Sequence, residues 1–160
     1  MIMDFSMACS FTGHRQIEPS HTWLPELLDK AIAYAYSEGC RDFYFGGAVG
    51  FDTLAARRAL SFRALHPDIR VNLILPCKNQ DEGWSDSDRA VYSLILSEAD
   101  SVEYVSEKYT RSCMQKRNRR LAALCDIMIA YVGRERSGSS QTVRLAREAG
   151  KRVYNLYNRG

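Results

Sequence analysis

Two glycine- and serine-rich stretches carry the residues of this sequence that are best suited to bind an anion. Glycine lets the backbone approach a phosphate closely, and the free N–H groups at a helix N-terminus attract negative charge. Residues 46–52 and 136–142 combine these features, because each stretch follows a predicted strand and opens a predicted helix. The candidate ligand-binding residues within them are Gly46, Gly47, Ala48, Gly50, Asp52, Ser137, Gly138, Ser139, Ser140 and Thr142.

Both stretches also have an explanation that needs no ligand. Asp52 could cap or pack against the following helix, and a plain serine N-cap would account for Ser139 or Ser140 but not for the whole run. The order Gly-Gly-x-x-Gly is neither the dinucleotide-binding fingerprint nor a Walker loop, which ends in Gly-Lys-Ser/Thr. The sequence therefore disfavours a nucleoside triphosphatase and leaves another kind of phosphate site open.

A short turn near the N-terminus adds two further donors. Gly13 permits a tight turn, and the side chains of His14 and Arg15 could then pair with an anion. The alternative is a surface loop with a solvated arginine. The turn supports a phosphate site only together with the other two stretches.

The basic segment 111–120 contains five Lys or Arg residues and no acidic residue. Most such runs are solvated helix faces. Arg117 and Asn118 differ, because their spacing to Leu121 continues the apolar stripe of the predicted helix. A ligand phosphate or ribose would supply the partners that such inward-facing groups need, and a salt bridge to an acid at the sheet edge is the alternative.

Patterns for metal binding or nucleophilic catalysis are poor. The three histidines show no metal-ligand spacing, so we expect no metal and no cofactor apart from a nucleotide-like ligand. The five cysteines are odd in number and form no Cys-x-x-Cys pair, which favours reduced thiols in a cytoplasm.

The hydrophobic pattern predicts a scaffold that brings these segments together. Segments whose apolar residues recur every three or four positions predict five helices, at 23–38, 51–65, 86–98, 113–124 and 140–149. Short apolar runs between them predict six strands, at 7–11, 42–45, 71–75, 101–105, 127–132 and 152–156.

This alternation predicts an α/β fold. Continuous apolar strands such as 127–132 are typical of a parallel sheet that is covered on both faces. We expect a doubly wound, mostly parallel, six-stranded Rossmann-like sheet with helices on both faces, in a single domain over 1–160. The carboxyl ends of parallel strands share one sheet edge, so the three turns should converge there.

Composition and net charge limit the kinds of partner that we expect this protein to bind. The 160 residues are 46% hydrophobic and 26% charged, which excludes disorder for the bulk of the chain. A net charge of +3 is too small by itself to indicate a nucleic-acid-binding protein. No signal peptide or membrane span is recognisable, so the sequence predicts a cytoplasmic protein with no membrane partner.

The ordered series of motifs resembles the YpsA-like (DUF1273) family of the SLOG superfamily, which also holds the lonely-guy phosphoribohydrolases and the DNA-processing protein A group. Nearly the whole chain takes part. The matching residues are Thr12-Gly13-His14-Arg15, Gly46-Gly47-Ala48-x-Gly50-x-Asp52, Gln80, Trp84, Tyr92, Ala99-Asp100, Tyr109, Arg117-Asn118, Cys125-Asp126 and Ser137-Gly138-Ser139.

The resemblance implies two alternative activities. Lonely-guy enzymes release a base from a nucleoside monophosphate with an Arg, which Arg117 matches, and a Glu after the last turn, where this chain has Leu145. Glu148, one turn later, could be a displaced substitute for that acid. DNA-processing protein A binds single-stranded DNA, but the accessory domains of that family have no room in 160 residues.

The leading hypothesis is therefore a sensor or regulatory domain that binds a nucleotide-derived ligand and has no clear catalytic machinery. The phosphate would lie against 46–50 and 137–140, paired with Arg117 and Arg15, while Asn118 or His14 would contact the ribose. N-glycosidic hydrolysis of a nucleoside monophosphate is the first alternative and single-stranded DNA binding the second. The superfamily resemblance also suggests a homodimer, and a sensor implies a protein partner that responds to the bound state.

Overall fold

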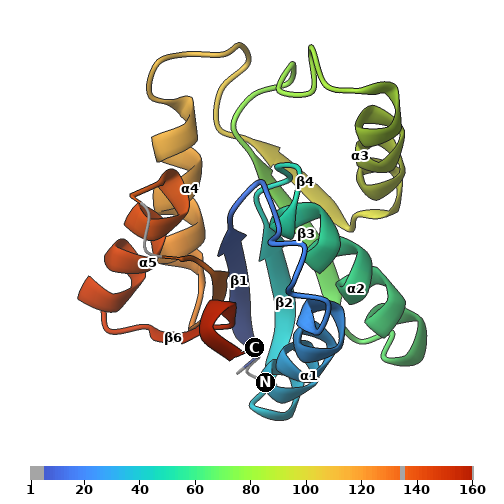
Figure 1. Cartoon of the computed structure of the whole chain (residues 1–160), viewed down its shortest axis with the longest axis vertical. Coiled ribbons are helices and arrows are strands. Elements are labelled where there is room, and N and C mark those ends of the chain that lie inside the picture. Colours follow the sequence, from blue (N-terminus) through green and yellow to red (C-terminus); the bar gives the residue numbers. More distant parts are fainter. Residues whose placement is uncertain (1–5, 134–135, 160) are drawn as a thin grey trace, which may run out of the picture.

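The computed structural model describes residues 6–133 and 136–159, and within them it contains one six-stranded sheet (Figure 1). The strands lie in the order β4-β3-β2-β1-β5-β6, and every neighbouring pair is parallel. The sheet is thus parallel throughout rather than mostly parallel. The strands are β1 (Met7–Gly13), β2 (Cys40–Phe45), β3 (Arg70–Leu75), β4 (Ser101–Tyr104), β5 (Ile127–Tyr131) and β6 (Arg152–Asn155).

Five α-helices cover the two faces of this sheet in the described part of the chain, as the sequence predicted (Figure 1). On one face lie α1 (Leu24–Ser37), α2 (Phe51–Leu65) and α3 (Asp86–Glu98), which contact one another in chain order. On the other face α4 (Cys113–Leu124) packs against α5 (Gly138–Glu148). A short 3-10 helix, η1 (Tyr157–Arg159), follows β6.

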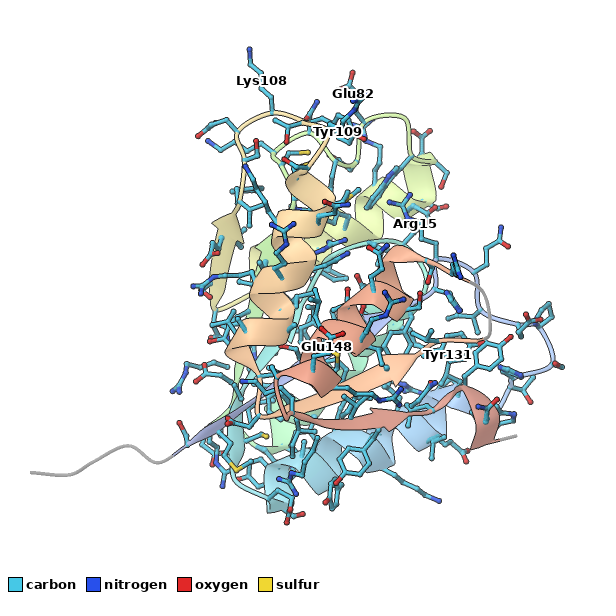
Figure 2. All side chains as sticks on the ribbon, turned by 90° about the vertical axis from the view of Figure 1, so that its left-hand side faces the viewer. Arg15, Glu82, Lys108, Tyr109, Tyr131 and Glu148 are labelled. Atoms are coloured by element: carbon cyan, nitrogen blue, oxygen red, sulfur yellow. The ribbon has the colours of Figure 1, made fainter. Side chains whose placement is uncertain are left out.

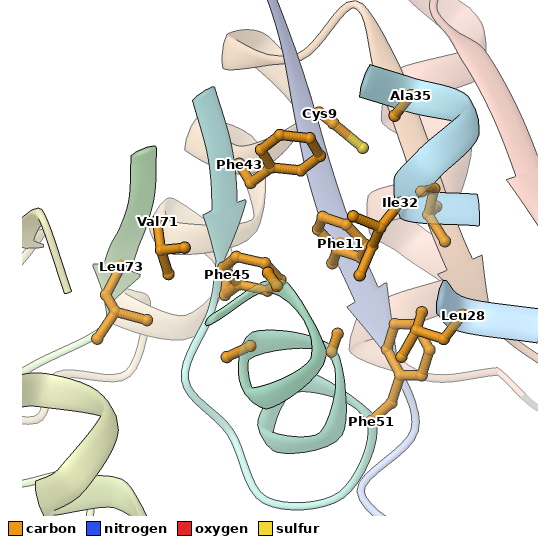
Figure 3. Close-up of a cluster of buried hydrophobic side chains, with 14 of the residues drawn as sticks. Cys9, Phe11, Leu28, Ile32, Ala35, Phe43, Phe45, Phe51, Val71 and Leu73 are labelled. Atoms are coloured by element: carbon orange, nitrogen blue, oxygen red, sulfur yellow. The ribbon is translucent and has the colours of Figure 1, made fainter. Parts of the chain in front are cut away.

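Aromatic and aliphatic side chains fill the space between the sheet and α1 (Figure 3). The rings of Phe11 on β1 and Phe45 on β2 stack with their centroids 4.5 Å apart. Leu28 and Ile32 of α1 lie against this aromatic layer. The apolar stripe predicted for this helix is therefore its buried face.

Several element boundaries differ by one or two residues from the sequence prediction, and two of these differences have a clear physical reason. β1 extends past the predicted end at residue 11, because the backbone of Thr12 and Gly13 pairs with Ala130 and Tyr131 of β5. The last helix starts at Gly138 rather than at 140, because Ser137 is its N-cap.

The strand order reverses beside β1. The chain adds β2, β3 and β4 on one side of β1 and then returns to place β5 and β6 on the other side. Loops that leave β1 and β5 therefore diverge, and such a switch point is where open α/β sheets bind ligands. No helix within the described ranges combines the length and the apolar character needed to cross a membrane.

Candidate functional site

A cavity of about 270 Å³ lies at this switch point, among the ends of β1, α2, α4 and α5. Most of the sequence-predicted site residues meet here. The residues that line it are Thr12, Gly13, His14, Arg15, Ala48, Asp52, Met114, Arg117, Asn118, Leu121, Ser137, Gly138 and Ser139. Gly46, Gly47, Gly50, Ser140 and Thr142, also predicted for the site, are not among the lining residues.

Arg117 reaches the cavity from α4 and is only 7% exposed. Its Nη1 donates a hydrogen bond to the carbonyl oxygen of Gly46, and its Nε donates to Asn118 Oδ1 at 2.8 Å. Its Nη2 has only the thioether sulfur of Met114, 3.8 Å away, which is a weak acceptor. The ion pairs within residues 6–133 and 136–159 include none between Arg117 and a carboxylate, so the salt bridge considered from the sequence is not found in the described part of the chain.

A buried cation without a paired anion is costly. Burial accordingly lowers the pKa of Arg117, and the negative charge of Asp52 nearby opposes that shift. The guanidinium is held in one orientation by Gly46 and Asn118, while its Nη2 end has no strong partner. This end of Arg117 can receive an anion without losing its protein contacts.

Asp52 stands in the first turn of α2 and is only 6% exposed. Its Oδ2 accepts a hydrogen bond from the backbone N–H of Ala48 at 3.2 Å. Its Oδ1 is buried and has no hydrogen-bond partner within the described ranges. Burial raises the pKa of Asp52 from its ordinary 3.8 to about 6, although the charge of Arg117 and the hydrogen bond from Ala48 lower it.

The two carboxylate oxygens of Asp52 thus have different environments. The bond to Ala48 connects Asp52 to the loop before α2 and is not the helix cap considered from the sequence, since the N-cap position is Gly50 and α2 has no side-chain cap. The second oxygen belongs to a side chain on the cavity wall and is left without a donor. Buried polar atoms in native proteins are nearly always paired, so an exception at a cavity points to a missing partner.

The glycines before α2 allow the backbone to pass close to its neighbours. A Cβ at Gly46 would stand 2.7 Å from Arg117 Nη1, and one at Gly50 would stand 2.1 Å from the carbonyl oxygen of Arg15. Gly50 also has a φ of +83°, a conformation that favours glycine. These glycines hold Arg117 and the loop after β1 in place, while Ala48 provides the loop's contribution to the cavity wall.

Gln80, a motif residue from the loop after β3, supports the same turn. Its Nε2 donates to the carbonyl oxygen of Gly47 at 3.2 Å and to the hydroxyl of Tyr92 at 3.0 Å. The ring of Trp84 packs edge-on against Tyr92, with centroids 5.1 Å apart. These three residues connect α3 to the glycine loop and do not line the cavity.

The turn before α5 is closed by its own hydroxyls. The Oγ of Ser137 accepts from the N–H of Ser140 at 3.1 Å, and Ser140 Oγ accepts from the N–H of Ser137 at 2.8 Å. This reciprocal pair is a capping box. The serine N-cap expected as an alternative therefore exists, but at Ser137.

The other two hydroxyls of this turn are also engaged. Ser139 Oγ donates to the carbonyl oxygen of Gly13 at 2.7 Å, and Thr142 Oγ1 donates to the carbonyl oxygen of Gly138 at 2.8 Å. The first bond ties α5 to the end of β1. What the turn offers to the cavity is the positive end of the α5 dipole, since these side-chain donors already have partners.

His14, Arg15 and Asn118 line the cavity, and they differ in which of their polar side-chain atoms already have partners. His14 Nε2 accepts a hydrogen bond from the N–H of Gly133 at 2.7 Å, so its proton lies on Nδ1 when the ring is neutral. Asn118 Oδ1 is occupied by Arg117 Nε. Arg15 is exposed at the rim and forms no ion pair within the described ranges.

The sequence prediction omits three lining residues, Thr12, Met114 and Leu121. Met114 and Leu121 could have been found, because they stand one turn before and one turn after Arg117 and Asn118 on the same helical face. Thr12 opens the motif 12–15 that carries the family resemblance, but it was not predicted as a ligand-binding residue.

Glu148, the proposed substitute for a catalytic acid, does not line the cavity. It lies in a neighbouring groove of about 280 Å³ between α4 and α5, and Asn118 lines both this groove and the cavity. Figure 2 shows Glu148 at the end of α5 that is farther from Arg15. Among the described residues, Asp52 provides the only carboxylate on the cavity wall.

The fold and the cavity together define a class. The chain is a Rossmann-like α/β protein with a polar cavity at the switch point of its sheet, beside the N-termini of two helices. The model of the YspA SLOG family matches residues 10–157. The chain belongs to this family, which confirms the resemblance found in its motifs.

Relatives and solved structures agree with this assignment. The UPF0398 protein of Bacillus thuringiensis strain Al Hakam is 24% identical over 142 residues, covering 82% of this chain and 77% of the relative. DNA processing protein A from Helicobacter pylori, described by its single-stranded DNA binding mode, has a TM-score of 0.64 at 24% identity and is matched over 92% of this chain. The Streptococcus pneumoniae protein of that name has a TM-score of 0.65 at 20% identity, over 94% of this chain.

This chain spans 63% of the Helicobacter protein chain and 50% of the Streptococcus one. At these identities the likeness establishes the fold alone. The ligand and the activity have to be argued from the cavity.

Proposed function

We propose that this domain binds a nucleotide-derived ligand and places its phosphate in the cavity, as a sensor or regulatory module. The observation that carries the proposal is Arg117, a buried cation with no carboxylate partner in the described ranges and with an Nη2 group that meets only a thioether. A phosphate oxygen is a strong, charge-assisted acceptor for a guanidinium.

The groups around Arg117 also favour a negatively charged ligand. The N-termini of α2 and α5 both face this region, and each carries a partial positive charge. Arg15 adds a mobile cation at the rim. These contributions act on one small volume, so an anion gains from all of them at once.

The size of the cavity limits the part of the ligand that it holds. At about 270 Å³ it lies at the lower end of small-molecule pockets, which typically measure roughly 300 to 1,000 Å³. A phosphate with its sugar fits this volume better than a complete dinucleotide. The base would then extend towards the rim near Arg15.

N-glycosidic hydrolysis is the second candidate, because Asp52 is a buried carboxyl group on the cavity wall with a pKa raised to about 6. Such a pKa suits an acid or base near neutral pH. Glu148 no longer supports this alternative, since it faces another groove. Hydrolysis would release free base and ribose phosphate.

Single-stranded DNA binding rests on the fold likeness and is the third candidate. Salt-sensitive retention of an oligonucleotide would support it, because binding to phosphates releases counterions. A cytoplasmic location, a homodimer and a protein partner also stay predictions.

The proposal is tested by identifying the small molecules released when the purified protein is denatured. Wild type is compared by mass spectrometry with Arg117→Ala, Arg117→Lys and Arg119→Ala. Arg119 is the matched control, because it is exposed on the same helix and outside the cavity. We expect a phosphorylated, nucleotide-like compound from wild type and Arg119→Ala, and much less of it from both Arg117 variants.

The same proteins are then titrated with AMP, and thermal unfolding verifies that each is folded. Loss of a charge-assisted bond predicts AMP binding at least about tenfold weaker for the Arg117 variants than for Arg119→Ala. The proposal is overturned if all four proteins release the same compounds and bind AMP alike, or if wild type neither releases a nucleotide nor binds AMP. Free base with ribose phosphate would instead favour the hydrolase.

A further inference from the structure

The Oδ1 atom of Asp52 is the feature of the cavity that a phosphate does not explain. It is buried and has no hydrogen-bond partner within the described ranges. A carboxylate oxygen in this state costs folding free energy that a donor would recover. Because Asp52 lines the cavity, a molecule bound there can supply this donor.

Asp52 and Arg117 stand side by side, yet they do not satisfy each other. A Cβ at Gly46 would lie 3.0 Å from Asp52 Oδ2 and 2.7 Å from Arg117 Nη1, so both groups approach the same point of the loop. Arg117 donates instead to Gly46 and Asn118. The cavity therefore presents a cation and a hydrogen-bond acceptor close together.

A ligand that matches this pair needs an anionic group and a neutral donor close to each other. A second phosphate oxygen at Asp52 would face an ionised carboxylate and be repelled. A sugar hydroxyl is neutral, donates one hydrogen bond and lies within a few bonds of the phosphate in a nucleotide. It can meet Asp52 while the phosphate meets Arg117.

The other residues expected to contact the ribose have their acceptors occupied. Asn118 Oδ1 accepts from Arg117, and His14 Nε2 accepts from the N–H of Gly133. Ser139 and Thr142 donate to backbone carbonyls. Among the described side chains of the cavity wall, Asp52 Oδ1 is the buried acceptor that has no hydrogen-bond partner.

We infer that Asp52 accepts a hydrogen bond from a ribose hydroxyl of the ligand whose phosphate pairs with Arg117, so that the site selects ribonucleotides over deoxyribonucleotides. This inference rests on the proposed function and names its ligand class. It also separates the site from one built for DNA, since a 2′-hydroxyl distinguishes RNA from DNA.

The test compares ligands that differ by one hydroxyl. Wild type, Asp52→Asn and Arg119→Ala are titrated calorimetrically with AMP, 2′-deoxy-AMP and 3′-deoxy-AMP. Asparagine keeps the shape of Asp52 and an oxygen for the Ala48 N–H, but presents an NH₂ group where Oδ1 stood. The wild-type series tests the hydroxyl without any substitution in the protein.

We expect wild type and Arg119→Ala to bind AMP at least about tenfold more tightly than 2′-deoxy-AMP, since a hydrogen bond to a charged group is lost. For Asp52→Asn, AMP and that analogue should bind within about threefold of each other. The selectivity should therefore disappear together with the carboxylate.

The outcomes distinguish this inference from the proposed function. If wild type binds AMP and both analogues equally, and Arg117→Lys weakens all three, the phosphate site stands and the ribose contact is wrong. Equal weakening of all three ligands in Asp52→Asn would also overturn the ribose contact. If wild type binds none of them, the proposed function itself fails.

Discussion

Two turns open helices beside the same cavity, and they differ in how fully their polar groups are paired. Before α5, the hydroxyls of Ser137, Ser139 and Ser140 all have partners inside the protein. In the first turn of α2, Asp52 keeps one buried oxygen unpaired, close to the incompletely paired Arg117.

The difference separates a turn whose hydroxyls serve the fold from a turn in which a buried polar atom still lacks a partner. A turn whose hydroxyl oxygens are all hydrogen-bonded inside the protein contributes stability and the helix dipole. A turn that leaves a buried carboxylate oxygen unpaired sacrifices stability, which is typical of functional sites. Substitutions in the two turns should therefore separate stability from binding.

The largest effect is expected at Gly50, where the α2 turn crosses the loop after β1. Gly50→Ala places a Cβ 2.1 Å from the carbonyl oxygen of Arg15 at a φ of +83°. We expect a loss of at least about 3 kcal/mol in the free energy of unfolding, measured by denaturant titration. Gly83→Ala is the matched control, because its φ is +86° but nothing lies within 4 Å of the new Cβ.

The control separates backbone strain from the steric clash. Gly83→Ala should cost only about 1 kcal/mol. Equal losses in the two variants would show that the close approach of Arg15 to Gly50 does not matter for stability.

The next effect concerns the burial of Asp52 and depends on pH. Because its folded pKa of about 6 lies above its ordinary 3.8, the folded state binds the proton more tightly than the unfolded state. Wild type therefore loses stability as pH rises from about 4 to about 6, on the order of 2 kcal/mol from this group. Asp52→Asn has no such group and should be more stable than wild type at pH 7.

Denaturant titrations of both proteins at pH 4 and pH 7 measure this difference. The advantage of Asp52→Asn should be large at pH 7 and small at pH 4. An advantage that is the same at both pH values would mean that Asp52 does not titrate in this window.

A smaller effect is expected at the α5 turn. Ser137→Ala removes the N-cap and should cost about 1 kcal/mol in the free energy of unfolding. Ser85→Ala, at the N-cap of α3, removes the same kind of bond away from the cavity and should cost about the same. AMP affinity should change by less than about threefold in both, since these hydroxyls serve the helices. A large loss of affinity in Ser137→Ala alone would make this turn part of the binding machinery.

The smallest effect is expected at Glu148. Glu148→Gln should leave AMP affinity unchanged and alter the free energy of unfolding by less than about 0.5 kcal/mol, because the side chain is exposed in a separate groove. Titration with AMP and a thermal melt measure both quantities. A strong fall in AMP binding or turnover would return Glu148 to the catalytic alternative.

Much of this architecture could be predicted from local patterns. The helices expected at 51–65, 86–98 and 113–124 coincide with α2, α3 and α4, because apolar spacing and chain punctuation are encoded within each segment. The three turns were expected to lie close together, because the carboxyl ends of parallel strands share one edge of the sheet. The end of β1 could not be predicted, since it depends on pairing with β5, far along the chain.

The sequence indicated most of the residues that line the candidate site. It indicated less well which contacts each of these residues makes there. Arg117 and Asn118 stood out because polar residues interrupted an apolar stripe. The bond from Arg117 to Asn118 joins two neighbours on α4, whereas the bond from Arg117 to Gly46 depends on the contact between α4 and the loop after β2. No spacing rule contains that information.

By itself, the amino-acid sequence determined the order of strands and helices, and it singled out the glycine- and serine-rich turns and Arg117 as candidates for a site, because periodicity and residue type act locally. Only the tertiary structure decided which polar atoms have partners. It paired the serines before α5 with one another and with β1, and it left Asp52 Oδ1 unpaired beside Arg117. The hydrogen bonding and the burial of a polar side chain depend on elements that are far apart in the sequence and meet in the fold. These two properties identify the polar atoms for which a ligand could supply the missing partner.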